Sequence, residues 1–553
     1  MPLSWITGEG TRDSLLLARL ADENRGPGAY GLEKLAASVW GMVPWKAPTD
    51  RVSKTNATLW ASVDRVARCR TDAWVSARLV ARYADAAPAP LLDVVHRIAS
   101  TIDRVCLAGL VVDLAEFDRR AIATATRVEG LAARLAEAAA EAGMLVFAPT
   151  NDNHIRSLLF EHLALEPPAR TKTGLASVDK TTLRELGHPT ADLLLEFSEW
   201  DKVQTTAFVG KPGGKANPIA ALLHRYGPTR GYLPLHINPL GARTGRRSSN
   251  YPNCQNWTKD FRRIVTSRWL GGLVADCDYS RLEMVLIALA AGDEDLLAYF
   301  TTGEGYIGIA RWLWGRVVVD GSNEYRASKS LQLGINYGMG PGHMARDMWY
   351  RMLVRLAATY EEHADVVRQM HRRYLRRFWR LRQYARAREA EMLETGQVVS
   401  AVGQVRHLPG ADRSLASYGH LLNQAINFPI QCLASYVTGC ALVDVERELL
   451  AVNNVSYSEH LRALLATRKK WLTTGPACGI MPTIDIPPDY DISVICNEVH
   501  DDIVVDLHPA HPKRDIELVV ETMRAVPSLV GLGVDLSRVL RVGVKTSTHW
   551  CGE

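Results

Sequence analysis

Hydrophobic and polar positions follow a helical period over most of the chain. Good helix formers with apolar residues three or four positions apart run from residue 91 to residue 142, interrupted by a short extended run at 110–113. A second pair of helices is predicted near 181–208, and a long helical tract is predicted over 345–395. The pattern therefore predicts a protein that is mainly helical.

Patterns typical of β-strands are confined to two segments. Residues 255–300 predict a strand followed by a helix, and residues 480–508 are rich in strand-forming residues around DISVICNEVHDDIVVDL. The stretch GKPGGKANP at Gly210–Pro218 breaks the helical pattern, and we interpret it as a mobile basic loop. Residues 453–490 give mixed signals and are interpreted as a connecting insertion.

Size and composition narrow the class of protein. At 553 residues and 61.2 kDa the chain is long enough for several domains. Its net charge of +5 permits a polyanionic partner without requiring one. Nine cysteines without a CxxC pair indicate reduced thiols rather than a zinc or disulfide scaffold. Neither an apolar run of about 18 residues nor a signal-type segment is recognised, so we expect a soluble, cytoplasmic protein with no membrane partner.

Acidic residues end both strand-like segments. LVADCDYS carries Asp276 and Asp278, and VICNEVHDD carries Asp501. If the two strands are neighbours, their carboxylates enter one cleft, where two Mg²⁺ ions about 3.5–4 Å apart would activate a hydroxyl and stabilise a leaving pyrophosphate. The alternative is that these acids are ordinary solvated turn residues.

Glu283 raises a question of its own, because it lies in the apolar helix that follows Asp278. A buried carboxylate is costly unless it has a partner or a task. A second helix, YRASKSLQLGINYGMG, places cations below an apolar and an aromatic residue along one side, and these residues are Arg326, Lys329, Leu333, Asn336 and Tyr337. Such a face suits a triphosphate and a base, although a solvated helix surface has the same composition.

In combination, these motifs resemble those of family A DNA polymerases. DYSRLE, RASKSLQLGINYG and VHDD occur in the family's order, preceded by TGRRSSNYPNCQN at 244–256 and joined by NFPIQ at 427–431. The resemblance covers about residues 90–553. It implies a multidomain α+β fold shaped like a right hand, with an antiparallel palm sheet and mostly helical thumb and fingers.

The resemblance also implies a division of the chain. Residues 1–88 are expected to be a truncated remnant of a 3′–5′ exonuclease, 89–225 the thumb, 226–300 the first part of the palm, 301–405 the fingers and 406–553 the second part of the palm. The remnant resembles only the last part of an exonuclease domain, with an acid such as Asp72 but without the D-x-E strand. We therefore expect no proofreading by this chain alone.

Site roles follow from the resemblance, position by position. Asp278 and Asp501, with the backbone carbonyl of Tyr279, would hold two Mg²⁺ ions, and Lys329 and Arg326 would hold the incoming triphosphate. Three residues would shape the nucleotide pocket: Glu283 as a steric gate against a ribose 2′-hydroxyl, Leu333 near the 3′ side, and Tyr337 beside the nascent pair. The residues expected to contact primer-template DNA are Arg246, Gln255, Asn256, Gln431 and His500.

The sequence departs from the family pattern around the triphosphate. Tyr325 stands where an arginine is usual, Tyr306 where a histidine is usual, Leu333 where an aromatic residue is usual, and Asp502 where a glutamate is usual. We interpret Asp276 as a solvated or supporting acid, because Asp278 is the one followed by Tyr and Ser.

A segment rich in arginine, His371–Met392, interleaves cations with aromatic residues. It is either an amphipathic fingers helix with solvated arginines or a contact for single-stranded template, and both can hold on different faces.

The predicted function is template-directed DNA synthesis from primer-template DNA and dNTPs, with a separate exonuclease or processivity factor as possible partners. The alternatives are a catalytically inactive polymerase-like DNA-binding subunit and a single-subunit RNA polymerase. The short length and compact palm suggest a bacteriophage source.

Overall fold

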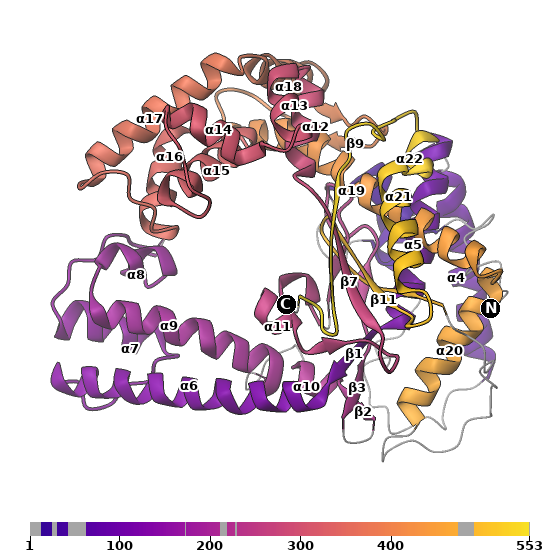
Figure 1. Ribbon diagram of the computed structural model, residues 1–553, viewed down its shortest axis with the longest axis horizontal. Helices are drawn as coiled ribbons and strands as arrows, with labels where there is room; N and C mark the ends of the chain where they lie inside the picture. Colours follow the sequence, from indigo (N-terminus) through magenta and orange to yellow (C-terminus); the bar gives the residue numbers. More distant parts are fainter. Residues whose placement is uncertain are drawn as a thin grey trace.

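The computed structural model describes residues 13–24, 30–42, 62–83, 85–171, 173–210, 218–226, 229–250, 252–473 and 492–551. Its elements are arranged around a central opening, with helices above and below the opening and the two larger sheets on one side (Figure 1). The predicted loop at 211–217 and the end of the predicted insertion, 474–490, lie outside the described residues.

The lower arm consists of helices, as the thumb prediction requires. It begins where Asp113 ends strand β1 (Leu110–Asp113) and caps α6 by accepting hydrogen bonds from the backbone N–H groups of Ala115 and Glu116. The α-helices of this arm are α6 (Leu114–Glu141), α7 (Asp152–Arg156), α8 (Lys180–Leu186), α9 (Pro189–Val203) and α10 (Ile219–Leu222). Two π-helical turns, η2 (Ser157–His162) and η3 (Gln204–Phe208), extend α7 and α9. Their apolar faces form a core of their own around Leu131, Leu135 and Leu194.

The upper arm also consists of helices. They are α12 (Leu282–Ala291), α13 (Glu294–Thr301), α14 (Gly305–Trp314), α15 (Asn323–Asn336), α16 (Pro341–Arg346), η5 (Asp347–Arg351), α17 (Tyr360–Arg377) and α18 (Arg380–Thr395). The predicted tract at 345–395 is therefore interrupted at 352–359, because Thr359 and Glu362 form a capping box that starts α17. The arms meet where Arg346 donates to Glu185 across 2.9 Å, which closes the ring.

The sheet that carries the acids is antiparallel, with strand order β10-β11-β7-β12. These strands are β10 (Val494–Val499), β11 (Asp502–Leu507), β7 (Leu273–Tyr279) and β12 (Val542–Ser547). The register pairs Asp502 with Asp278 and Val504 with Asp276. The two acidic segments of the sequence are thus neighbouring strands, which is the condition for their carboxylates to enter one cleft.

A second sheet has the order β2-β3-β1-β6 and joins the lower arm to the rest of the chain. Its other strands are β2 (His224–Tyr226), β3 (Arg230–Leu233) and β6 (Val265–Thr266). Because β2 pairs with β3, the predicted thumb boundary at residue 225 falls inside a hairpin. The smaller elements are β4 (Ile237–Asn238), β5 (Ser248–Ser249), η4 (Cys254–Asn256), α11 (Lys259–Arg262), β8 (Gln397–Val399) and β9 (Val405–His407).

Long helices support the sheets from behind. They are α5 (Ala89–Ala108), α19 (Tyr418–Val452), α20 (Tyr457–Thr473) and α21 (Pro512–Ala525), and the short α22 (Pro527–Val530) packs on α19. By length and composition α19 could cross a membrane, but 83% of its most apolar window is buried inside the protein, as in a core helix. The interpretation of 453–490 as a connecting insertion missed α20, whose Leu461 and Leu464 are buried.

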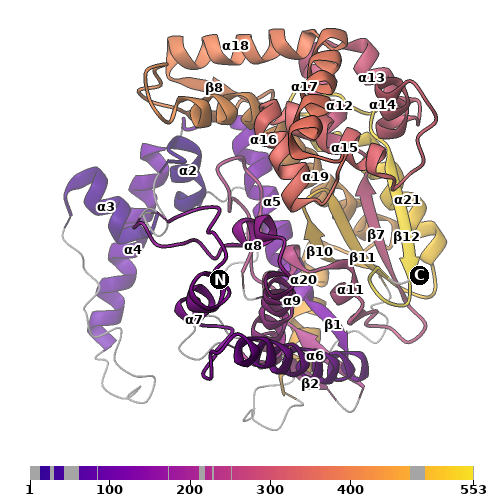
Figure 2. The ribbon, with the colours of Figure 1, turned by 90° about the vertical axis from the view of Figure 1, so that its left-hand side faces the viewer.

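The N-terminal region contributes helices α2 (Ser14–Ala21), α3 (Leu32–Trp40) and α4 (Ser62–Arg82). Figure 2 shows them on one side of the molecule, with α21 and β12 on the other. They share a small core that includes Leu35, Val75 and Leu79. The exonuclease-like character of residues 1–88 stays a prediction, and 1–12, 25–29 and 43–61 lie outside the described residues.

Candidate active site

The acidic cluster is a consequence of strand register. In β7, Asp276 and Asp278 lie two residues apart and so share one face of the sheet. Directly opposite Asp278 in β11 is Asp502, and the closeness of the two carboxyl groups raises the pKa of Asp502. Asp501 precedes β11 in the turn from β10, where its carbonyl oxygen accepts from the backbone N–H of Tyr279 at 3.4 Å. Four carboxyl groups therefore gather at one end of the sheet.

The electrostatics of this cluster favour bound cations. Burial raises the pKa of Asp501 to about 7, and the charges of Glu283 and Asp278 add to the effect. Burial and the contact with Asp278 also raise the pKa of Asp502. Two ionised carboxylates this close repel each other, so the pair favours keeping one proton when no cation is bound. Oδ1 of Asp276 is buried without a hydrogen-bond partner. A cation would relieve each of these costs.

The donor set fits Mg²⁺. The available atoms are hard carboxylate and carbonyl oxygens, which Mg²⁺ prefers, and it takes only one or two protein carboxylates when substrate phosphates and water complete its shell. Within the described ranges, no three His, Cys, Asp or Glu side chains form a complete ligand set by themselves. Tyr279 is held in place because its buried hydroxyl donates to the carbonyl oxygen of Met523 at 2.6 Å.

Glu283 has a specific partner. It lies in the first turn of the apolar helix α12 and forms an ion pair with Arg246, with side-chain exposures of 19% and 30%. The adjacent Arg247 is fully buried and donates to Glu498 at 2.8 Å, which anchors the segment that presents Arg246. The question raised by the sequence is thus answered in part: the buried carboxylate is paired with a cation from TGRRSSNYPNCQN.

The ion pair borders a pocket between three helices. The pocket is lined by Glu283, Met284, Ile287, Leu333, Asn336, Tyr337, Asn427 and Ile430. Asn427 of α19 donates to the carbonyl oxygen of Tyr337 at 3.2 Å and so fixes the end of α15. The structure therefore brings together the residues predicted to shape a nucleotide pocket, Glu283, Leu333 and Tyr337.

The two predicted phosphate-binding cations are placed differently. Lys329 is exposed on α15, with Nζ 5.2 Å from the ring centroid of Tyr306. Arg326 is also exposed, but its guanidinium donates to the carbonyl oxygen of Met352 at 2.6 Å. Lys329 is free to meet an anion, whereas Arg326 is engaged by the loop after η5.

The predicted DNA-contacting residues fall into two groups. Asn256 and His500 are exposed, and His500 adopts a left-handed φ of 60° in the turn beside Asp501. Gln431 is partly buried in α19. Gln255 is buried, and its side-chain oxygen accepts from the backbone N–H of Ser249 at 3.1 Å, so here it braces the backbone. Arg246 is committed to Glu283.

Sequence reasoning missed several residues near the acids. Arg262 lies 3.8 Å from Asp502 and stacks on Trp550 at 4.6 Å, and the Cys551 thiol lies 3.5 Å from Asp276. Contacts between residues this far apart along the chain leave no local pattern. Arg281, by contrast, is part of DYSRLE, and a cation at the end of an acidic strand was a signal that the sequence offered.

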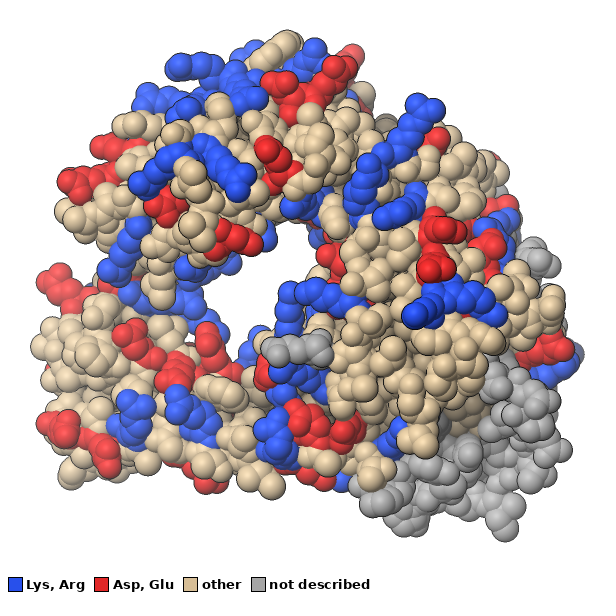
Figure 3. All heavy atoms as spheres, viewed as in Figure 1, with Lys and Arg blue, Asp and Glu red and all other residues tan. Residues whose placement is uncertain are grey.

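The surroundings of the site suit a polyanion. The space-filling view shows an opening through the molecule between the two arms, with Lys and Arg side chains along much of its rim (Figure 3). An acidic cluster on an antiparallel sheet, a cation-bearing helix above it and a second helical arm below define the class of right-hand polymerase folds.

Comparison with known proteins places the chain within that class. The family described as DNA polymerase family A matches residues 119–551. The chain therefore belongs to DNA polymerase family A. The thermostable DNA polymerase I of Thermus aquaticus is 29% identical over 331 residues, which is 57% of this chain and 36% of that protein. DNA polymerase I of Mycobacterium bovis is 29% identical over 308 residues, 53% of this chain and 31% of that protein.

A solved structure confirms the fold. The POL domain of Pol1 from M. smegmatis, in complex with DNA primer-template and dNTP, superimposes with a TM-score of 0.70 at 20% identity, covering 98% of this chain and 82% of that one. The predicted right-hand fold is thus confirmed. The chain spans about a third of the length of the curated relatives named above. The bacteriophage source stays a prediction.

Proposed function

We propose that the protein is a template-directed DNA polymerase that joins a dNTP to a primer 3′-hydroxyl. The observation that carries this proposal is the meeting of Asp278 and Asp501 at the end of the β7–β11 pair. The charge of Glu283, which lines the nucleotide pocket, acts on Asp501. Family membership supports the same reaction.

Divalent cations belong to this proposal. Asp278, Asp501 and the carbonyl oxygen of Tyr279 would hold two Mg²⁺ ions, which supply activation of the attacking hydroxyl and neutralisation of the leaving pyrophosphate. The contribution of the chain is to keep these oxygens in one place. Strand register fixes Asp278, and the buried hydroxyl of Tyr279 fixes its own backbone.

The nucleotide would lie between α12, α15 and α19. Lys329 would bind the triphosphate, and Arg326 would join it after releasing Met352. Tyr337 would pack beside the nascent base pair, with Leu333 as an apolar wall. Glu283 would fill the space that a ribose 2′-hydroxyl needs, held there by Arg246.

Primer-template DNA would occupy the opening. Arg246, Gln431 and His500 would contact the primer terminus and minor groove, and Gln255 and Asn256 would support that surface. Most of the affinity would come from phosphate contacts with the cations of the rim. Because Arg246 also pairs with Glu283, the primer terminus and the sugar pocket share one residue.

Three finer points complete the proposal. The chain alone does not excise a mismatched 3′ end, a separate exonuclease or processivity factor acts with it, and it works in the cytoplasm. The purified protein is given Mg²⁺ and a primer-template with a 3′ mismatch, either with dNTPs or without them. Neither reaction should show 3′–5′ degradation. Metal-dependent degradation that persists after rigorous purification would contradict the first point.

The test of the main proposal is primer extension with Mg²⁺. Extension that copies the template and prefers dNTPs supports the assignment. Equal or better use of rNTPs would indicate a single-subunit RNA polymerase instead. Tight primer-template binding with no extension under any divalent cation would indicate an inactive DNA-binding subunit.

A further inference from the structure

Of the two cations on this side of α15, Arg326 donates to the carbonyl oxygen of Met352, whereas Lys329 lies over an aromatic ring. One turn before Lys329 stands Tyr325, and the neighbouring ring that Lys329 covers is Tyr306, 5.2 Å from Nζ. Phenol hydroxyls carry no charge at neutral pH, and burial raises the pKa of both tyrosines further. A bound triphosphate carries several negative charges, so Lys329 by itself neutralises only a small part of that charge.

Arg281 is a second cation close to the same tyrosines, because its charge acts on both Tyr306 and Tyr325. It follows the acidic strand β7 and precedes α12, with a left-handed φ of 60°. This backbone state is uncommon for a residue with a side chain and fixes the direction in which Arg281 leaves the chain. Its position is therefore set by the strand-to-helix turn that also sets Asp278 and Glu283.

A glycine makes room for the Arg281 guanidinium. A Cβ atom on Gly305, at the start of α14, would overlap that guanidinium. Arg281 also donates to the carbonyl oxygen of Gly303 through a long contact of 3.4 Å. The positive charge acts on the hydroxyls of both Tyr306 and Tyr325, opposing the effect of burial on each pKa. Arg281 therefore lies against the residue before Tyr306, and Lys329 lies over the Tyr306 ring.

Neither of these two cations is neutralised. In the part of the chain that the structure describes, no carboxylate forms an ion pair with Arg281 or Lys329. Glu283, whose charge acts on Tyr306, is already paired with Arg246. Arg316, another exposed arginine of this arm, is paired with Glu324 at 2.6 Å. Two unpaired cations around one aromatic ring, beside an acidic cluster, form a site for a polyphosphate anion.

We propose that Arg281 binds the β- and γ-phosphates of the incoming nucleotide together with Lys329, supplying the cation that Tyr325 does not. This inference rests on the proposed polymerase function. The bidentate fork of arginine suits phosphate oxygens, and the same groups would meet the pyrophosphate product. Arg281 is then a substrate-binding residue of this chain.

The test uses Arg281→Gln, which keeps a long polar side chain but removes the charge. Single-nucleotide extension should show the KM for the correct dNTP rising about 10- to 100-fold, the effect of losing hydrogen bonds to a charged group. The matched control, Arg316→Gln, removes an arginine of the same arm that is already paired, and its KM should equal that of the wild type.

Binding is measured separately from chemistry. With a dideoxy-terminated primer, which cannot be extended, the correct dNTP stabilises a ternary complex, and Arg281→Gln should weaken that stabilisation by the same factor. Binding of primer-template alone and the melting temperature should not change. The double variant Arg281→Gln/Tyr325→Arg restores a cation one turn from Lys329 and should recover at least part of the dNTP affinity.

The outcomes are distinguishable. If the wild type extends primers but Arg281→Gln keeps its dNTP affinity, the inference is wrong and the polymerase assignment stands. If Arg281→Gln fails to fold or to bind primer-template, and the double variant does not recover dNTP affinity, the role of Arg281 is only to stabilise the backbone at Gly303, before α14. A wild type that neither extends primers nor forms the ternary complex overturns the proposed function itself.

Discussion

Sugar selection should depend on the ion pair between Glu283 and Arg246. The Glu283 carboxylate borders the pocket shared by α12, α15 and α19, and Arg246 holds it there. Replacement by alanine removes the side chain that a ribose 2′-hydroxyl would meet. We expect Glu283→Ala to accept ribonucleotides much more readily than the wild type, with little change for dNTPs.

The size of the effect follows from the geometry. Glu283 is 19% exposed and Arg246 is 30% exposed, so the pair is partly screened and its loss costs less than that of a fully buried pair. Selection against ribonucleotides comes from the steric and desolvation cost of placing one 2′-hydroxyl beside the carboxylate, which is about 1–3 kcal/mol. The preference for dNTPs over rNTPs should therefore fall about 10- to 200-fold.

The assay is single-nucleotide incorporation of dNTP and rNTP on one primer-template, expressed as a ratio of kcat/KM values. Two further variants separate bulk from charge. Glu283→Gln keeps the bulk, so most selection should remain. Arg246→Met leaves the carboxylate in place but unheld, so selection should weaken to an intermediate level. A ratio unchanged by Glu283→Ala would show that the carboxylate is not the gate and that its contact with Arg246 is purely structural.

Three further predictions follow from the same contacts. Leu333→Tyr should place a hydroxyl in the pocket and reduce discrimination against dideoxynucleotides about 5- to 150-fold. Ribonucleotide rejection should not change, and unaltered use of dideoxynucleotides would refute the pocket assignment. Burial raises the pKa of Asp501 in the folded protein from an ordinary 3.8 to about 7. The metal-free protein should therefore lose stability as the pH rises from 3.8 to 7. Asp501→Asn should raise the melting temperature of the metal-free protein at about pH 8 and remove the stabilisation by Mg²⁺. Glu185→Ala should free the arm held by Arg346 and speed primer-template association in stopped flow, whereas Arg351→Ala, which breaks a pair within one turn, should not.

The local pattern of apolar and polar residues was sufficient to predict most of the helices and strands. The extended run at 110–113 is strand β1, and the helices on either side of it are α5 and α6. Glu283 lies in the apolar helix that the sequence predicted. In His371–Met392, Tyr374 and Phe378 face the core as the amphipathic interpretation requires, although Trp379 is half exposed.

Contacts between segments that are distant along the chain could not be predicted from the local sequence pattern. Sequence reasoning asked what partner Glu283 has, but Arg246 is brought to it only by the packing of its segment against α19 and β10. The same holds for Arg262 and Trp550 beside the acids. Helix α20 was missed because charged and polar residues alternate in the sequence with the leucines that are buried in the structure.

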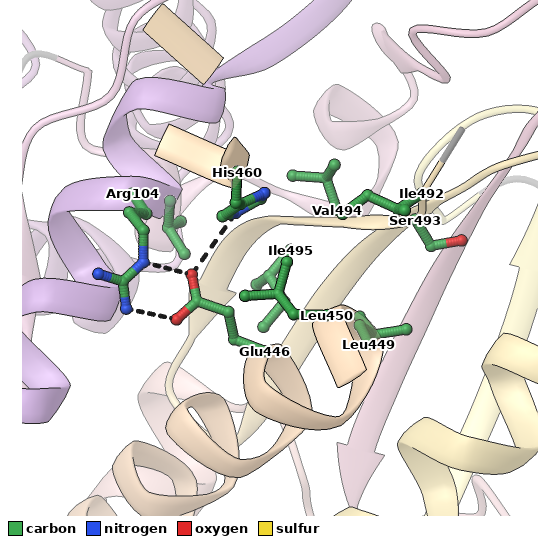
Figure 4. A pocket seen from close by; sticks show the side chains of 10 residues that line it. Arg104, Glu446, Leu449, Leu450, His460, Ile492, Ser493, Val494 and Ile495 are labelled. Carbon is green, nitrogen blue, oxygen red and sulfur yellow. Dashed lines mark hydrogen bonds and ion pairs between the residues drawn. The ribbon is translucent and has the colours of Figure 1, made fainter. Parts of the chain in front are cut away.

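Figure 4 shows a third example behind the sheet, where α5, α19 and α20 meet. Arg104 forms a two-pronged ion pair with Glu446, with contacts of 2.6 Å, and His460 of α20 lies 3.6 Å from the same carboxylate. Arg104 holds the pKa of Glu446 near 2 in spite of burial, which by itself would raise it. This anchor fixes α20 to the palm, and no helical or strand period in the sequence encodes it.

The central claim is that Asp278 and Asp501 are the metal-binding acids of a polymerase. The most direct measurement is single-nucleotide primer extension in Mg²⁺ by Asp278→Asn and Asp501→Asn, with Asp276→Asn as the matched control on the same strand face. Extension by the first two should fall at least about 1,000-fold while primer-template binding is retained, and the control should remain measurably active. Full activity of either first variant, or loss of activity only in Asp276→Asn, would contradict the account.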